Sequence, residues 1–257
     1  SYTLPNHTEN ITLTGSLART ATGNSLNNTL TGNTASSTLA GAEGDDTFVI
    51  SDTNNVVSES INEGTDLIQA SVSYTLPSNT ENITLTGSGN IYATGNSLDN
   101  TLTGNSGANR LIGGEANDTL TGLTGADQFQ LGPGSDQVTD FNIAQGDFVG
   151  IQTSQNYSIS QVGSDLLINV ASVGSVLLQG VNAGDFDSAF QIIRTDGSGN
   201  PIPPTIAITE DDADDFLGVG DTATISFTLS KASTNFIESD VSFSGGSLSN
   251  WNAASAT

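Results

Sequence analysis

The sequence contains no cysteine and no methionine, and only 4 Lys and Arg stand against 28 Asp and Glu. Without cysteine the chain can form no disulfide bond and no thiolate metal site. A formal net charge of −24 repels phosphate and anionic lipid, which argues against nucleic acid and membrane surfaces as partners. No apolar run approaches the roughly 20 residues of a membrane-spanning helix, so we expect no membrane insertion. Cations are the partners that this composition favours.

The sequence also has few side chains suited to catalysis. His7, the single histidine, lies in a turn where the repeat counterpart is Asn79, so we do not expect it to act as a general base. Without a second histidine or a cysteine, most zinc chemistry is excluded as well. Two carboxylates would suffice for a glycosidase, but nothing in the sequence singles out a pair in a cleft. We therefore expect no enzymatic activity within these residues.

What the first half does contain is a nine-residue period. Large apolar residues recur nine or ten positions apart, with few exceptions, and Gly, Asn, Asp and Ser fill the intervals. These small polar residues form turns because they accept positive φ or bond their own backbone. Each nonapeptide therefore predicts one short strand and one turn. The apolar positions are Leu4, Leu13, Leu30, Leu39, Phe48, Val57, Leu67, Leu76, Leu85, Leu102, Leu111, Leu120, Phe129 and Val138.

A longer repeat keeps the phase of the short one. Residues 1–5 recur unchanged as 73–77, and residues 8–15 recur unchanged as 80–87. This spacing equals a whole number of nonapeptides, so both periods describe one solenoid. One Leu or Phe per nonapeptide cannot offset the entropy of ordering nine residues. Stacking of coils and bridging cations must supply the remaining stability.

Residues 113–121, 122–130 and 131–139 resemble the nonapeptide G-G-x-G-x-D-x-U-x of the repeats-in-toxin (RTX) family, where U is a large apolar residue. The resemblance extends over five nonapeptides, residues 95–139. It implies a right-handed parallel β-roll whose turns bind calcium through backbone carbonyls and the sixth-position Asp. Each ion would lie between turns that are two nonapeptides apart on the same edge.

The resemblance also implies a ligand set for about two to four calcium ions, mostly within residues 95–147. One edge would stack Asn100, Asp118 and Asp136. The other would stack Asn109 and Asp127 and run on toward Asp140. The best-equipped ion would lie between the turns of Asp118 and Asp136. The remaining members of the predicted set are the turn glycines Gly113, Gly122, Gly125 and Gly134 and the final ligands Asp140 and Asp147.

The first array departs from this pattern. Only Asp46, in a turn with Gly44, fills the sixth position, whereas its equivalents are Asn28, Ser37 and Asn55. A metal-free solenoid in which Asn and Asp cap turns is therefore the favoured interpretation of residues 1–58. No motif assigns a role to the other acidic residues of the region, and we expect them to be solvated loop carboxylates: Glu9, Asp52, Glu59, Glu63, Asp66 and Glu81.

The sequence predicts an all-β chain with four parts. Residues 1–149 form the β-roll, and residues 150–196 form a cap of antiparallel β-strands, with alternating segments at 157–162, 165–170 and 175–180. Residues 197–204 have linker composition. Residues 205–257 resemble the immunoglobulin-like repeats of large bacterial surface adhesins. Too few strands fit for a whole sandwich, so we expect an incomplete domain and an excerpt of a longer protein.

These features predict a secreted, calcium-binding structural or adhesive module of a bacterial extracellular or cell-surface protein. The resemblance to the RTX family implies that it is exported unfolded and folds in external calcium. Four alternatives remain open: the C-terminal carrier region of a secreted enzyme or toxin, a self-assembling surface-layer or filament subunit, a Thr-rich ice-binding solenoid, and a chain that is disordered without calcium. Besides calcium, other copies of the chain or a surface ligand are candidate partners.

Overall fold

The computed structural model describes residues 1–152, 155–186, 192–195, 206–210 and 225–229. Within these ranges the chain is almost entirely β-structure, as predicted, and the one helix is a 3-10 turn, η1 (Ile143–Gln145). In the described part of the chain, no helix has the length and apolar character of a membrane span. The chain divides into two compact units, Ser1–Pro201 and Ile202–Thr257.

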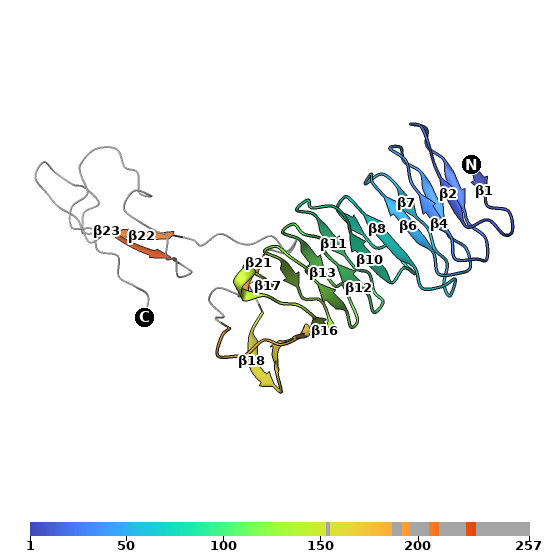
Figure 1. The fold of residues 1–257 in the computed structure, drawn as a ribbon. Helices are drawn as coiled ribbons and strands as arrows, with labels where there is room; N and C mark the ends of the chain where they lie inside the picture. The colour runs from blue at the N-terminus through green and yellow to red at the C-terminus, as the bar shows by residue number, and fades with distance from the viewer. Residues whose placement is uncertain (153–154, 187–191, 196–205, 211–224, 230–257) are drawn as a thin grey trace, which may run out of the picture. The chain divides into compact units, whose positions relative to one another are not determined.

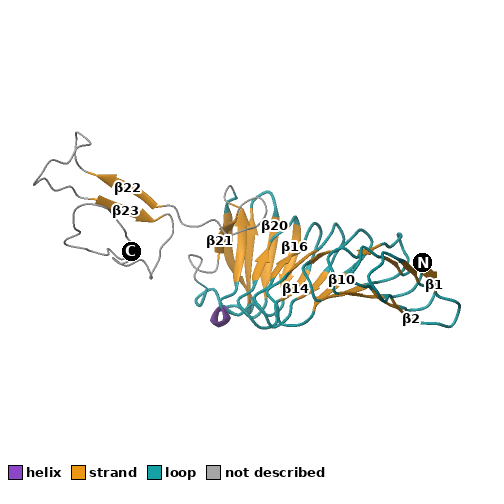
Figure 2. Ribbon diagram, turned by 90° about the horizontal axis from the view of Figure 1, so that it is seen from above, coloured by secondary structure: helices purple, strands orange, loops and turns teal. Residues whose placement is uncertain are grey.

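The first unit is a β-solenoid in which successive strands alternate between two layers (Figures 1 and 2). One layer is a single eleven-stranded sheet. In spatial order its strands are β18 (Tyr157–Val162), β19 (Asp165–Val170), β20 (Gly174–Leu178), β16 (Gly134–Val138), β14 (Thr119–Thr121), β12 (Thr101–Thr103), β10 (Asn82–Leu85), β8 (Leu67–Ala70), β6 (Thr47–Ile50), β4 (Thr29–Thr31) and β2 (Asn10–Thr12).

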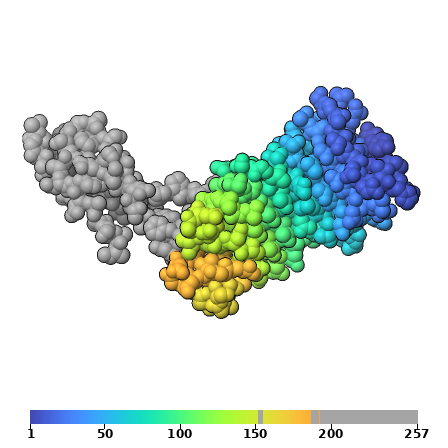
Figure 3. All heavy atoms as spheres, viewed as in Figure 1, coloured from blue at the N-terminus to red at the C-terminus, as the bar shows by residue number. Residues whose placement is uncertain are grey.

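The other layer consists of two sheets. The four-stranded sheet contains β1 (Tyr2–Thr3), β3 (Thr20–Thr22), β5 (Thr38–Ala40) and β7 (Val56–Val57). The six-stranded sheet contains β21 (Ile192–Thr195), β17 (Phe148–Gln152), β15 (Gln128–Gln130), β13 (Arg110–Ile112), β11 (Tyr92–Thr94) and β9 (Tyr74–Thr75). In the space-filling view the sequence runs steadily along the solenoid, so each coil meets only its neighbours (Figure 3).

A Thr-Leu-Thr pattern explains the short strands. In β4 and β14 the central Leu is fully buried and the flanking Thr side chains are half-buried on the outer face, as the alternation of a strand requires. Parallel pairing then stacks Leu30 on Phe48 and Leu111 on Phe129. The result is one continuous apolar core along the solenoid.

One residue of the apolar series, Leu67, lies in a strand as predicted but does not face the core. Ile68, and not Leu67, is fully buried and pairs with Phe48 and Ile83. The segment before it, residues 58–66, is nine residues long, whereas a consensus turn has six. The longer loop places the buried residues Val57 and Ile68 eleven positions apart, instead of the nine or ten of the pattern.

The two arrays meet at a break in one layer. Strand β7 ends the four-stranded sheet and β9 begins the six-stranded sheet, while β6, β8 and β10 continue unbroken on the other layer. At the break, the Tyr74 hydroxyl donates to the carbonyl of Asn55 at 3.0 Å and accepts the N–H of Val57 at 3.3 Å. One partly buried side chain therefore bridges the interrupted strands.

At the C-terminal end the predicted antiparallel cap is only partly correct. Strands β18, β19 and β20 form an antiparallel meander. Two chain reversals, however, return β20 to the direction of the solenoid strands, so it pairs with β16 in parallel. Strand β21 likewise pairs with β17 in parallel.

Only two strands of the second unit are described. Strands β22 (Ile206–Glu210) and β23 (Ile225–Leu229) pair antiparallel. The predicted linker, residues 197–204, and the rest of the predicted immunoglobulin-like segment lie outside the described residues.

Candidate metal centres

The residues at sixth positions of the turns, and those at the equivalent place at the end of longer loops, form two columns, one along each edge of the solenoid. The first edge leads into the eleven-stranded sheet, and the second edge leads into the other layer. All of these residues except Glu81 are buried. The first edge carries Asn28, Asp46, Asp66, Glu81, Asn100, Asp118 and Asp136, and the second carries Ser37, Asn55, Asn109, Asp127 and Asp147.

The aspartates of each column are linked through the backbone of the preceding coil. Asp118 Oδ1 accepts the N–H of Asn100 at 2.8 Å, and Asp136 Oδ1 accepts that of Asp118 at 3.1 Å. On the second edge, Asp127 Oδ1 accepts the N–H of Asn109 at 2.7 Å. These contacts bring the predicted residues into the two predicted stacks.

The end of the second stack differs from the expected one. Asp147 Oδ1 accepts the N–H of Asp127 at 2.8 Å, so Asp147 continues the column. Asp140, which the sequence places next, instead accepts the N–H groups of Gly122 and Leu123 at 2.9 and 2.7 Å. Both predicted final residues lie at this edge, but they contact different parts of the same turn.

The second carboxylate oxygens are the unusual feature of these columns. Within the described residues, Oδ2 of Asp118, Asp127 and Asp136 is buried and has no hydrogen-bond partner, and the same holds for Asp46 Oδ2. A buried, unpaired carboxylate oxygen is costly, and native proteins pair such atoms with donors or metal ions. The donor set therefore fits a cation that binds oxygen.

The predicted turn glycines leave room for these carboxylates. A Cβ on Gly113 would collide with the carboxylate of Asp118, and one on Gly122 would collide with that of Asp127. Gly125 and Gly134 have φ of +130° and +140°, a conformation that side chains disfavour. Gly44, in the turn of Asp46, has φ of +114°. The glycines thus shape the sites without supplying side-chain ligands.

In the turns of Asn100 and Asn109, the side-chain amide forms hydrogen bonds through both its oxygen and its nitrogen. Asn100 Oδ1 accepts the N–H of Asn96 at 2.7 Å, and Nδ2 donates to the carbonyls of Thr80 and Glu81, each at 3.2 Å. Asn109 makes the equivalent bonds within and below its own turn. The amide N–H groups take carbonyl oxygens that a cation could otherwise bind.

Burial shifts the acidity of the aspartates. Desolvation raises the pKa of Asp118 to about 7, and a hydrogen bond from Asn100 offsets only part of this effect. The pKa of Asp127 and that of Asp136 both rise to about 6 for the same first cause. Burial also raises the pKa of Asp147. A bound cation would favour the ionised form of each group.

Two acidic residues expected to be solvated are buried instead. Asp66 is 1% exposed and Glu59 is 9% exposed. Asp66 Oδ1 accepts the N–H of Asp46 at 2.9 Å, and Glu59 Oε1 accepts that of Gly41 at 2.6 Å. Asp66 follows Asp46 by twenty residues, so a search at a fixed spacing of eighteen overlooks it.

The other four acidic residues that we expect to be solvated are not fully buried. Glu81 is half-buried and accepts the N–H of Asp66 at 2.8 Å. Glu9 is exposed, and Asp52 and Glu63 are partly exposed and bond nearby backbone N–H groups. For these three, the structure agrees with the expected loop carboxylates.

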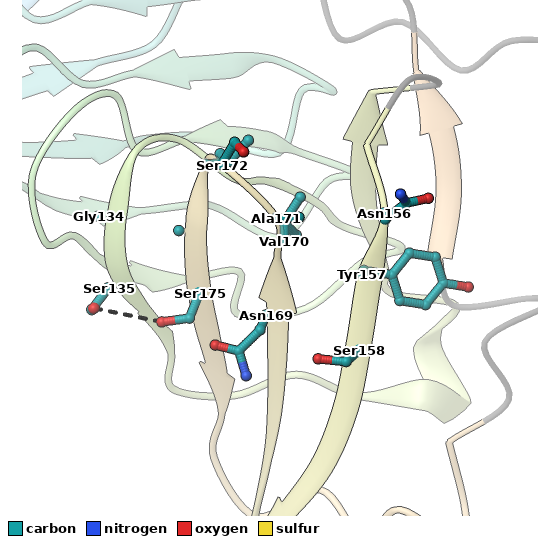
Figure 4. A pocket seen from close by; sticks show the side chains of 12 residues that line it. Gly134, Ser135, Asn156, Tyr157, Ser158, Asn169, Val170, Ala171, Ser172 and Ser175 are labelled. Atoms are coloured by element: carbon teal, nitrogen blue, oxygen red, sulfur yellow. Dashed lines mark hydrogen bonds between the residues drawn. The ribbon is translucent and has the colours of Figure 1, made fainter.

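A cavity of about 690 Å³ lies beside β16, β18, β19 and β20 (Figure 4). Its polar lining includes Ser135, Asn156, Tyr157, Asn169 and Ser175, and the hydroxyls of Ser135 and Ser175 are 3.5 Å apart. No lining residue carries a carboxylate, an imidazole or an amine. Among its lining side chains, only Tyr157 is of a type that general acid-base catalysis uses.

Models of known protein families match segments of both units. The model of the RTX calcium-binding nonapeptide repeat matches residues 22–57 and 94–138. The model of the bacterial Ig-like domain matches residues 201–257. These matches confirm both resemblances inferred from the sequence.

Two individual proteins are also similar to parts of the chain. Endo-1,3-1,4-beta-glycanase ExsH of Rhizobium meliloti (strain 1021) is 47% identical over 57 residues, which are 22% of this chain and 12% of that protein. Extracellular lipase LipA from Serratia marcescens is 14% identical with a TM-score of 0.29, and the match covers 69% of this chain and 40% of the lipase. The chain thus spans 12% of the length of ExsH and 40% of that of the lipase. From the family models, the chain carries RTX calcium-binding repeats in its solenoid and a bacterial Ig-like domain after it.

Proposed function

We propose that the solenoid is a calcium-dependent structural module, in which Asp118, Asp127 and Asp136 bind calcium together with carbonyls of their turns. The observation that carries this proposal is the set of buried Oδ2 atoms without partners. In calcium-free solution at neutral pH, like charges along each column oppose folding. Because calcium binds the folded turns and not the unfolded chain, its binding free energy becomes folding free energy.

Calcium fits this donor set better than the other common metals. The sixth positions offer carboxylate and amide oxygens, and the chain has no cysteine and only one histidine. Zinc and copper prefer nitrogen and sulfur ligands. Magnesium demands a near-octahedral site and keeps several waters, whereas calcium accepts six to eight oxygens in flexible geometry. Stacked turns rich in carbonyl oxygens suit calcium.

The proposed biological role is that of a secreted scaffold or adhesive stalk of a bacterial surface. The adjoining Ig-like domain supports this role, because such sandwiches commonly serve as modules of cell-surface proteins. Calcium-dependent folding would keep the chain unfolded in the calcium-poor cytosol and fold it outside the cell. Within this proposal, the residues of the chain itself perform no catalysis.

A second candidate is a carrier region attached to a catalytic domain. Its support is the stretch that is 47% identical to part of a glycanase. In that role the solenoid would aid export and folding, and catalysis would reside elsewhere in the protein. Sequencing the complete open reading frame distinguishes the two: a glycanase or other catalytic domain favours the carrier, and further Ig-like domains favour the stalk.

A calcium titration followed by far-ultraviolet circular dichroism tests the proposed folding. The variant Asp118→Ala/Asp127→Ala/Asp136→Ala is compared with Glu43→Gln/Glu115→Gln, which alters exposed acidic residues of two turns. We expect calcium to induce the β-signal in the wild type and in the Gln control, and the Ala variant to lose most of this response. A wild-type chain that is fully folded after calcium removal at neutral pH would refute the proposal.

A further inference from the structure

The junction between the two arrays holds a cluster that the nonapeptide motif does not describe. There the turn 41–46, which joins β5 to β6, stacks against the nine-residue loop 58–66, which joins β7 to β8. The N–H of Gly44 donates to the carbonyl of Glu63 at 2.6 Å, and the N–H of Thr65 donates to Asp45 Oδ1 at 2.9 Å. These bonds hold turn and loop in register.

Three carboxylates converge inside this stack. One oxygen of each accepts a backbone N–H: Asp46 Oδ1 from Asn28 at 2.6 Å, Glu59 Oε1 from Gly41 at 2.6 Å and Asp66 Oδ1 from Asp46 at 2.9 Å. The other oxygens, Asp46 Oδ2, Glu59 Oε2 and Asp66 Oδ2, are buried and have no hydrogen-bond partner. A ligand oxygen from each residue lies within 4.8 Å of those from the other two.

No basic side chain from the surrounding sequence is available to neutralise this cluster. Between Arg19 and Arg110 the sequence has no Lys, Arg or His. Three carboxylates at this separation repel one another strongly once they are removed from water. A Cβ at Gly41 would collide with the carboxylates of Asp46 and Glu59, so the glycine keeps open the space between them.

The same register recurs at the end of the second array. There the nine-residue loop 139–147 brings Asp140 and Asp147 to Asp127, through N–H bonds from Gly122 and Asp127. In that loop, however, the second oxygens of Asp140 and Asp147 accept the N–H groups of Leu123 and Asn142. Of these two loops, only 58–66 contributes carboxylate oxygens without a donor, Glu59 Oε2 and Asp66 Oδ2, and with Asp46 Oδ2 they make three.

We propose that Asp46, Glu59 and Asp66 bind a calcium ion of their own, which joins the two arrays. This site goes beyond the proposed function of the consensus turns, because Glu59 and Asp66 lie outside the residues that match the RTX repeat. A consensus turn supplies one Asp, and the longer loop supplies two further carboxylates where the regular stack is interrupted. Calcium suits such an irregular, all-oxygen site.

Equilibrium dialysis of the full chain against radioactive calcium at neutral pH tests this site. The variant Glu59→Gln/Asp66→Asn is compared with Glu43→Gln/Glu115→Gln, which removes the same number of charges from exposed positions. We expect the first variant to bind about one ion fewer than the wild type and the control to bind the wild-type number. Equal numbers for both variants would overturn the proposal.

The consensus sites are tested separately with Asp118→Asn/Asp127→Asn/Asp136→Asn. Retention of the ion that depends on Glu59 and Asp66 in this variant supports an independent junction site, even if the consensus turns bind none. Its loss overturns that independence.

Should the junction double variant fail to fold, Glu59→Gln alone is measured by calcium titration calorimetry, because its amide oxygen can still accept the Gly41 N–H. We expect the affinity for one ion to fall at least about tenfold, and an unchanged affinity would overturn the site.

Discussion

Asp and Asn at the sixth position make two different turns from the same backbone pattern. Asn100 bonds its own turn through Oδ1 and the preceding coil through Nδ2, so it completes the turn with protein atoms alone. Asp118 instead uses Oδ1 for the N–H of Asn100 and leaves Oδ2 buried without a partner. Between Asn100 and Asp118, therefore, the exchange of an amide for a carboxylate decides whether a buried oxygen is left without a hydrogen-bond partner.

This difference predicts an unusual pH dependence for the calcium-free chain. The pKa of Asp118 in the fold is about 7, against an ordinary value of 3.8. Because the folded state holds its proton more tightly, this group's contribution to stability is fully present below about pH 3.8 and is lost as the pH rises through about 7. Asp127 and Asp136 lose theirs as the pH rises through about 6.

We therefore expect the calcium-free chain to gain β-signal, and to unfold at higher urea concentration, when the pH falls from 7.5 toward 5. Apparent calcium affinity should change in the opposite direction, because protons compete with the ion for the same oxygens. The control is Asp118→Asn/Asp127→Asn/Asp136→Asn, whose amides do not titrate and whose pH dependence should be weaker. Calcium-free stability that increases steadily from pH 5 to pH 7.5 would contradict this account.

At the level of elements, the junction between the arrays depends on one aromatic side chain. The Tyr74 hydroxyl contacts both Asn55 and Val57 where β7 and β9 interrupt the sheet. Tyr74→Phe removes both hydrogen bonds and leaves buried backbone groups without a partner, which costs about 1–3 kcal/mol. Urea unfolding in saturating calcium should show this loss. A free energy of unfolding equal to that of the wild type would mean that water replaces the hydroxyl.

The sequence predicts regular elements better than the places where the repeat is interrupted. The strands with central Leu30, Leu102 and Leu120, and the stacking of Asp118 on Asp136, follow from a fixed period because each coil repeats its neighbour. The burial of Glu59 and Asp66 cannot be predicted from a fixed period. Their burial depends on a nine-residue loop, and a change of loop length moves each following side chain to a new position. Irregular loops therefore require the structure.

Beyond the solenoid repeat, the sequence predicts the strands but not how they pair. Alternating apolar residues indicate strands at 157–162 and 165–170, and β18 and β19 form there. The alternation of apolar residues does not show with which other strand each strand pairs. The pairing of β20 with β16 depends on the direction in which the chain re-enters the sheet, and that direction is a property of the whole meander.

For the whole molecule, the net charge of −24 raises the question of whether calcium acts at specific sites or by general screening. Salt screens exposed charges over about 10 Å at 0.1 M, but it acts weakly on buried groups. Since the carboxylates of the columns are buried, we expect about 0.5 M NaCl to leave the calcium-free chain at pH 7.5 largely without β-signal. Circular dichroism measures this directly, and full recovery of the signal in NaCl would indicate general screening.

The central claim is that the buried Oδ2 atoms without partners are cation ligands. The most direct measurement is anomalous diffraction from crystals of the chain grown in calcium and soaked in a lanthanide. The account predicts anomalous peaks within bonding distance of Oδ2 of Asp118, Asp127 and Asp136. Ordered water molecules bonded to these oxygens, with no anomalous peak beside them, would contradict it and leave a solenoid held together by hydrogen bonds and apolar packing alone.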